Sequence, residues 1–131
     1  MVRKYKKIVF YLAFIQVLTF FSCSGFTTEK KIFWKYYLVA IDTKDSCALS
    51  YKLDNGSYIG ITPDGVVEYA ESEKFIATKH LINSKTNYYI FPKIKTDEFT
   101  FEKFLIGPLD ENGLKNFEKQ NQLNLRFNKV N

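Results

Sequence analysis

The stretch SCALSYKLDNGSYIGITPDGVVEYA, residues 46–70, decides the fold class. Its first part alternates apolar and polar residues and ends at Asp54-Asn55-Gly56, which supplies the positive-φ residues of a tight hairpin. The next extended run ends at Pro63-Asp64-Gly65, where proline presets φ and glycine takes the left-handed position. Segments joined by turns this short pair antiparallel, because a parallel pair needs a crossover of a dozen residues or more.

Similar extended segments lie on both sides of this stretch. They are FWKYYLVAID (33–42), FIATKHL (75–81) and NYYIFPKI (87–94). Pro92 cannot donate to a ladder, so we expect the last of these strands to end there or to lie at an edge. Two more short strands are predicted in the C-terminal third, at 101–106 and 123–127.

The C-terminal third also contains the signals of one helix. Asp110 is a good N-cap, and Glu111 suits the positive end of the helix dipole. Leu114 and Phe117 lie three residues apart, which gives a narrow apolar stripe suited to packing on a sheet. The sequence therefore predicts an α+β fold, an antiparallel β-meander of about six to seven short strands with one C-terminal helix packed on the sheet.

The N-terminus has the three parts of a signal peptide. A basic stretch (1–7) precedes an apolar run (8–21), and small residues follow it. The apolar run is shorter than the roughly 20 residues that a membrane-spanning helix requires. We therefore expect the segment to be removed rather than kept as an anchor.

Cys23 stands where the apolar run gives way to small residues. The stretch LTFFSC (18–23) resembles a bacterial lipobox, in which a small residue precedes the cysteine that is lipidated. Ser22 fits this pattern, whereas Phe20 stands where an aliphatic residue is usual. We expect a membrane-anchored, extracytoplasmic lipoprotein on the periplasmic face or the cell surface. The domain organisation is then a signal peptide (1–22), the lipidated cysteine and a tether (23–32), and a single α+β domain (33–131).

The net charge of +5 belongs to the leader. Of the 19 lysines and arginines, four precede Cys23, and all 14 acidic residues follow it, so the remaining chain is close to neutral. The charge therefore does not indicate a nucleic-acid partner. The partners we expect are the membrane, through the lipid anchor, and another envelope or secreted protein.

The residue types that usually carry chemistry are few. Besides Cys23 there is one cysteine, Cys47. It falls on the apolar side of an alternating strand, which indicates a buried apolar site. His80 is the single histidine, and no motif marks a nucleophile for it to activate. One histidine and one spare cysteine cannot make a zinc site. We predict no catalytic constellation, no metal site and no cofactor.

Carboxylates are the remaining candidates, because two of them can be paired in space without any sequence motif. Five acids are not better explained by a turn or a cap, and we place these first for testing: Asp42, Asp45, Asp97, Glu98 and Glu102.

The second half of the chain resembles an uncharacterised family of small bacterial lipoproteins that carry a domain of unknown function. The resemblance rests on EYAESEKFIATKH, NYYIFPK and LIGPLDENGLKNF, with matching positions at Lys79, 88–90, 107–109 and Phe117. It is best over 66–117, and Pro92 departs from the aspartate that is frequent in the family. The resemblance implies a lipoprotein with a one-domain α+β layout, and no activity or site residues come with it.

We therefore expect a non-enzymatic binding or cell-envelope domain. One alternative is an immunity or inhibitor protein that neutralises a secreted toxin or hydrolase. The other is an enzyme that hydrolyses envelope polymers with spatially paired carboxylates.

Overall fold

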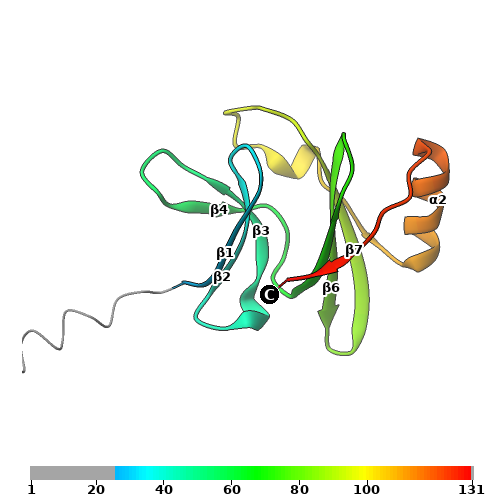
Figure 1. Ribbon diagram of the computed structural model, residues 1–131, viewed down its shortest axis with the longest axis horizontal. Helices are drawn as coiled ribbons and strands as arrows, with labels where there is room; N and C mark the ends of the chain where they lie inside the picture. The colour runs from blue at the N-terminus through cyan, green and yellow to red at the C-terminus, as the bar shows by residue number, and fades with distance from the viewer. Residues whose placement is uncertain (1–25, 131) are drawn as a thin grey trace, which may run out of the picture.

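The computed structural model describes residues 26–130. These residues form two antiparallel sheets and one α-helix, which lie in three layers (Figure 1). The strand order is β1-β2-β3-β4 in the first sheet and β8-β7-β6-β5-β9 in the second. The fold is α+β and mostly strand, as predicted, but the strands are divided between two sheets instead of forming one meander.

Most neighbouring strands within each sheet are consecutive in the sequence. The first sheet contains β1 (Phe26–Phe33), β2 (Tyr36–Ile41), β3 (Ala48–Lys52) and β4 (Tyr58–Gly60). The second sheet contains β5 (Val66–Glu71), β6 (Phe75–Ile82), β7 (Lys85–Pro92), β8 (Ile106–Leu109) and β9 (Asn128–Lys129). Two short 3-10 turns, η1 (Lys44–Ser46) and η2 (Phe101–Lys103), lie in the connections.

The turn at Pro63-Asp64-Gly65 separates the two sheets. Gly65 has the expected positive φ, +100°. After β4, Thr62 remains attached to the first sheet, because its Oγ1 accepts a 3.0 Å hydrogen bond from the Leu49 N–H. Beyond the turn, the Val66 N–H donates to the Cys47 carbonyl at 3.0 Å as β5 begins. The turn therefore carries the chain across from one sheet to the other.

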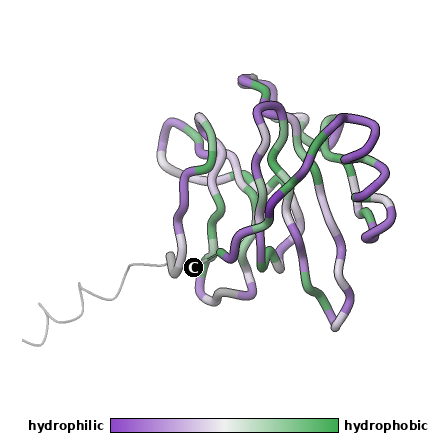
Figure 2. Tube along the Cα trace, turned by 45° about the vertical axis from the view of Figure 1, so that its right-hand side comes forward, coloured by the Kyte–Doolittle hydropathy of each residue, from purple (hydrophilic) through white to green (hydrophobic). Residues whose placement is uncertain are grey.

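The two sheets enclose the main hydrophobic core. Its largest members are aromatic and come from both sheets and from η2: Tyr36, Tyr51, Phe91 and Phe101. Their rings meet edge-on or tilted, with centroids 5.1–6.4 Å apart, a geometry that aromatic pairs favour. Figure 2 shows the apolar segments on the strands and the polar ones in the turns and in the helix.

Helix α2 (Glu111–Asn121) covers the other face of the second sheet. The predicted cap is present, since Asp110 Oδ1 accepts a 2.7 Å hydrogen bond from the Gly113 N–H. Leu114 is buried in a second core with residues of β5, β6 and β7. Phe117 meets Phe75 edge-on at 5.1 Å. The predicted apolar stripe of the helix therefore faces the sheet.

The N-terminal half differs from the prediction in two places. Residues 26–32, expected to be a tether, belong to β1 and pair with β2. The strand expected at 33–42 is interrupted by a tight turn at Trp34 and Lys35. Trp34 takes a φ of 50°, although no glycine, asparagine or proline marks the turn. Cys23 and the predicted signal peptide lie outside the described residues.

The C-terminal half differs as well. The strand expected at 101–106 is η2 followed by β8, and β8 pairs with β7, so β7 ends at Pro92 but is not an edge strand. Gly107 allows this pairing, because a Cβ there would lie 2.8 Å from the Tyr88 carbonyl oxygen. Residues 123–127 are not a strand. The last strand is β9, a short pair with β5.

Candidate functional site

His80 is a structural residue in this fold. Its side chain is fully buried, and both ring nitrogens have partners. Nδ1 lies 3.2 Å from the Asp64 carbonyl oxygen, and Nε2 lies 2.8 Å from Thr78 Oγ1. A carbonyl only accepts, so Nδ1 carries the proton and Nε2 accepts from the threonine hydroxyl. Burial lowers the pKa of His80, and neither nitrogen is free to activate a nucleophile.

Cys47 is buried as its alternation phase predicts. Burial, aided by the negative charge of Asp64, raises the pKa of its thiol to about 11. Because the thiolate is the nucleophilic form, this cysteine is inert at neutral pH.

The five candidate acids do not gather at one place. Asp42 and Asp45 lie in the β2–β3 connection, at one end of the sandwich. Asp97 and Glu98 lie in the loop after β7, and Glu102 lies in η2. Of the five, Asp97 is part of a cluster that contains a second carboxylate. Over the described residues 26–130, no group of three or more histidines, cysteines and acids has the arrangement of a metal site.

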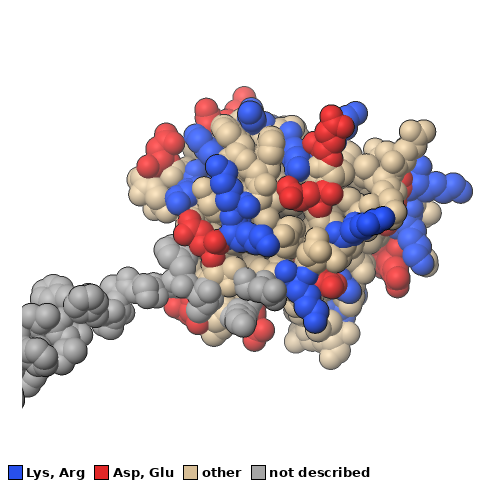
Figure 3. Space-filling model, viewed as in Figure 1, with Lys and Arg blue, Asp and Glu red and all other residues tan. Residues whose placement is uncertain are grey.

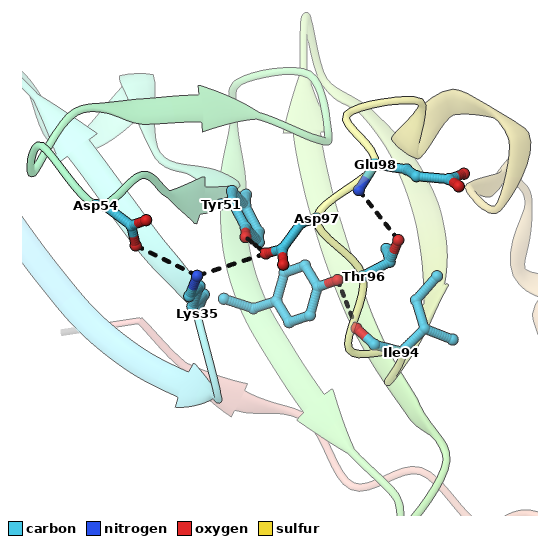
Figure 4. Close-up of polar contacts among 8 residues, drawn as sticks. Lys35, Tyr51, Asp54, Ile94, Thr96, Asp97 and Glu98 are labelled. Atoms are coloured by element: carbon cyan, nitrogen blue, oxygen red, sulfur yellow. Dashed lines mark hydrogen bonds and ion pairs between the residues drawn. The ribbon is translucent and has the colours of Figure 1, made fainter.

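The cluster around Asp97 occupies the other end of the sandwich. Strand β1 runs for eight residues from Phe26 to Phe33, which is about 26 Å at the usual rise of a strand. The turn that follows places Lys35 next to the β3–β4 turn and the 93–100 loop (Figure 1, Figure 4). We call this end, with Trp34, Lys35, Tyr51, Asp54, Asp97 and Phe99, the distal surface.

Lys35 joins the three segments of the distal surface. Its ammonium lies 3.3 Å from Asp54 Oδ1 and 3.5 Å from Asp97 Oδ1. The same ammonium lies 5.1 Å from the centre of the Trp34 ring. One lysine therefore connects two turns and a loop through charge and cation–π contact.

Hydrogen bonds of two core tyrosines hold the 93–100 loop in place (Figure 4). The Tyr51 hydroxyl donates to Asp97 Oδ1 at 2.9 Å, and the Tyr36 hydroxyl donates to the Ile94 carbonyl at 2.6 Å. At the start of the loop, the Lys93 N–H donates to the Lys74 carbonyl at 2.8 Å. The loop is thus tied to both sheets.

The surroundings of Lys35, Tyr51 and the neighbouring Tyr36 set their protonation states at neutral pH. Desolvation acts to lower the pKa of Lys35, but its contacts with Tyr51 and Asp54 outweigh it and raise the pKa. Desolvation raises the pKa of Tyr51, and it raises that of Tyr36 to about 12. The lysine is therefore a cation and both tyrosines are neutral at pH 7, so none of the three is a nucleophile or a general base.

The carboxylates of the distal surface are open to water. The side chains of Asp54 and Asp97 are 95% and 79% exposed. The hollow between them measures about 150 Å³, smaller than the roughly 300–1,000 Å³ of small-molecule pockets.

Phe99 gives the distal surface its apolar contact area. Its side chain is 57% exposed, while one side of the ring packs edge-on against Tyr51 at 5.9 Å. Aromatic side chains held in this way are typical of protein-binding surfaces, because little conformational entropy remains to be lost.

Sequence reasoning selected Asp97 but missed its partners. Lys35 stands alone among aromatic residues, where no motif marks it as functional. The tight turn accounts for Asp54 without any functional role. The signal that could have found Lys35 is its position at the end of a strand, between two aromatic pairs.

Charges of both signs are interspersed on the face of the molecule in Figure 3. Ion pairs join Lys52 to Glu29 and Lys93 to Glu71. Within residues 26–130, no helix has the length and apolar character needed to cross a bilayer. No protein-family model matches the chain, and no curated protein sequence and no solved structure is significantly similar to it.

Proposed function

We propose that this chain is an extracytoplasmic lipoprotein, acylated at Cys23, whose folded domain binds another envelope or secreted protein without catalysing a reaction. The observation that carries the proposal is the distal surface. It combines an exposed aromatic side chain, Phe99, with a fixed cation and two exposed carboxylates. Protein interfaces use this composition, an aromatic anchor with a polar rim.

The position of the distal surface also supports the proposal. Phe26, the first described residue, follows Cys23 by three residues, and the distal surface lies at the far end of β1. A lipid at Cys23 would leave this surface directed away from the membrane, where a partner protein can reach it.

The proposal is tested with the full-length protein in its own membranes. A photo-crosslinking amino acid at Phe99 should give one specific protein adduct, and the added variant Lys35→Ala should remove that adduct. The matched control places the crosslinker at Lys119, which is exposed on α2. Identical adducts from both positions, or none from position 99, would contradict a distal binding surface.

The anchor is tested separately. Cys23→Ala should abolish acylation and move the protein out of the membrane fraction. Membrane association that survives this change would mean that the segment 8–21 is retained as an anchor.

An inhibitor or immunity role is the second form of the same proposal. It is favoured if mass spectrometry identifies the adduct as a secreted toxin or hydrolase. The hydrolase alternative predicts instead that the purified protein releases soluble fragments from cell-wall polymer, and that Asp97→Asn abolishes this release.

A further inference from the structure

Opposite the distal surface, three connections of the chain meet at the end of the sandwich where β1 begins. They are the 42–47 connection, the Pro63–Gly65 turn and the β6–β7 hairpin. The Val66 N–H donates to the Cys47 carbonyl at 3.0 Å, and the Leu81 N–H donates to the Gly65 carbonyl at 3.1 Å. These bonds hold the three connections together, and we call this end the proximal surface (Figure 1).

Three of the exposed apolar side chains belong to the strands that end at the proximal surface. Leu81 is 52% exposed, Ile41 is 47% exposed and Ile82 is 39% exposed. Ile41 is the strand partner of Phe26, so it lies where the chain arrives from Cys23. Three residues can span at most about 11 Å, so a lipid on Cys23 would hold this end of the sheet close to the bilayer.

The β6–β7 hairpin indicates which kind of partner covers this end. Leu81 and Ile82 are adjacent in a strand, and adjacent strand residues point to opposite faces. The flat surface of a partner protein would cover one of the two faces. The interfacial region of a lipid bilayer surrounds a hairpin tip, so it covers both.

We propose that the proximal surface rests on the bilayer, with Ile41, Leu81 and Ile82 in the interfacial region beside the lipid anchor. This inference rests on the proposed acylation of Cys23. Asp42, Asp45 and Asp64 lie at the same end and are exposed. Carboxylates resist burial and do not attract anionic lipid, so they limit the depth of insertion and leave the apolar side chains to make the contact.

Tryptophan fluorescence tests the proposal in the full-length acylated protein. The chain has a single tryptophan, Trp34, on the distal surface. The protein is placed in vesicles of phosphatidylethanolamine and phosphatidylglycerol with or without brominated acyl chains, which quench tryptophan at close range. The wild-type emission should be unchanged by bromination and quenched by iodide in the water.

Leu81→Trp adds a second tryptophan at the hairpin tip. About half of the total emission should then be lost in brominated vesicles, because one of two tryptophans lies in the bilayer interface. Lys85→Trp, at an exposed position on the facing strand, is a second reporter if Leu81→Trp fails to fold. Asn55→Trp, exposed in the β3–β4 turn, is the distal control and should lose nothing.

The loss of emission from the Leu81→Trp variant should persist at about 0.5 M NaCl, where exposed charges are screened. It should persist in brominated phosphatidylcholine vesicles as well. Full emission from both tip variants, while the protein still sediments with the vesicles, would overturn the inference and leave the lipoprotein proposal intact. Equal quenching of the Asn55→Trp control would overturn it too, because the domain would then have no preferred orientation. Absence of acylation and of sedimentation would overturn the lipoprotein proposal, and this inference with it.

Discussion

The Tyr51 hydroxyl donates a 2.9 Å hydrogen bond to Asp97 Oδ1, which joins the middle of the first sheet to the loop that follows β7. Tyr51 is 2% exposed and belongs to the core, whereas the Asp97 side chain is open to water. This pair therefore connects the packing of the interior with the shape of the distal surface.

Tyr51→Phe should lower the free energy of unfolding by about 0.5–1.5 kcal/mol, the usual net contribution of one hydrogen bond. Urea denaturation measures this loss. In a double-mutant cycle with Asp97→Ala, the two changes should be non-additive, because they remove the same bond. Additivity within about 0.3 kcal/mol would mean that the bond does not contribute to stability.

Tyr36 should make the protein sensitive to alkali. Its pKa is raised by burial to about 12, and its hydroxyl donates to the Ile94 carbonyl. A raised pKa in the folded state gives stability that is complete below the unfolded value of about 10. That stability is lost as the pH rises from 10 through 12. Thermal unfolding between pH 9 and 12 measures the loss, and Tyr36→Phe should show a smaller decline over this range.

His80 should make the protein less stable in mild acid. Burial lowers its pKa in the folded state, so the unfolded chain binds a proton at a higher pH than the folded one. Stability should therefore fall as the pH drops below about 6.5. Because this is the single histidine, its C2 proton resonance can be followed directly by NMR. A midpoint at or above 6.5 in the folded protein would refute the prediction.

Leu114 and Asp110 should stabilise the helix layer by different amounts. Leu114→Ala removes a buried side chain and should cost about 2–5 kcal/mol. Asp110→Ala removes the cap of Gly113 and should cost about 1 kcal/mol. Lys119→Ala, on the exposed face of the same helix, is the matched control and should change stability by less than about 0.5 kcal/mol. A loss of less than about 0.5 kcal/mol for Leu114→Ala would mean that the helix is not packed on the sheet.

The double variant His80→Gln, Cys47→Ala should fold and keep the crosslink at position 99, since neither side chain reaches the surface. Alanine is preferred to serine at position 47, because an unpaired hydroxyl in an apolar site costs about 1–3 kcal/mol. A folded variant that loses the crosslink would point to a functional role for one of the two.

The sequence predicts correctly those features that depend on a few neighbouring residues. The hairpin glycine at 56, the cap at Asp110 and the phase of Cys47 each depend on a few neighbouring residues, and the structure confirms them. The division into two sheets was missed, because a Pro-Asp-Gly turn looks the same whether it joins paired strands or crosses between sheets.

The candidate site was predicted only through Asp97. Its partners Lys35 and Asp54 come from separate turns, and their meeting depends on how the 93–100 loop folds over the end of the sandwich. The turn at Trp34 was also missed, because its left-handed backbone is imposed by the pairing of β1 with β2 and not by the residue type.

Strand β9 lies beside β5, although almost the whole second half of the sequence separates them. The adjacent Val130 packs against the core between the sheets, and its N–H donates to the Val67 carbonyl at 3.2 Å. In a nascent chain this flank of β5 therefore stays open until these late residues have been synthesised. Until then β5 presents an unpaired edge to its surroundings, and such an edge is a template for pairing with another chain, so the unfinished chain needs protection from aggregation.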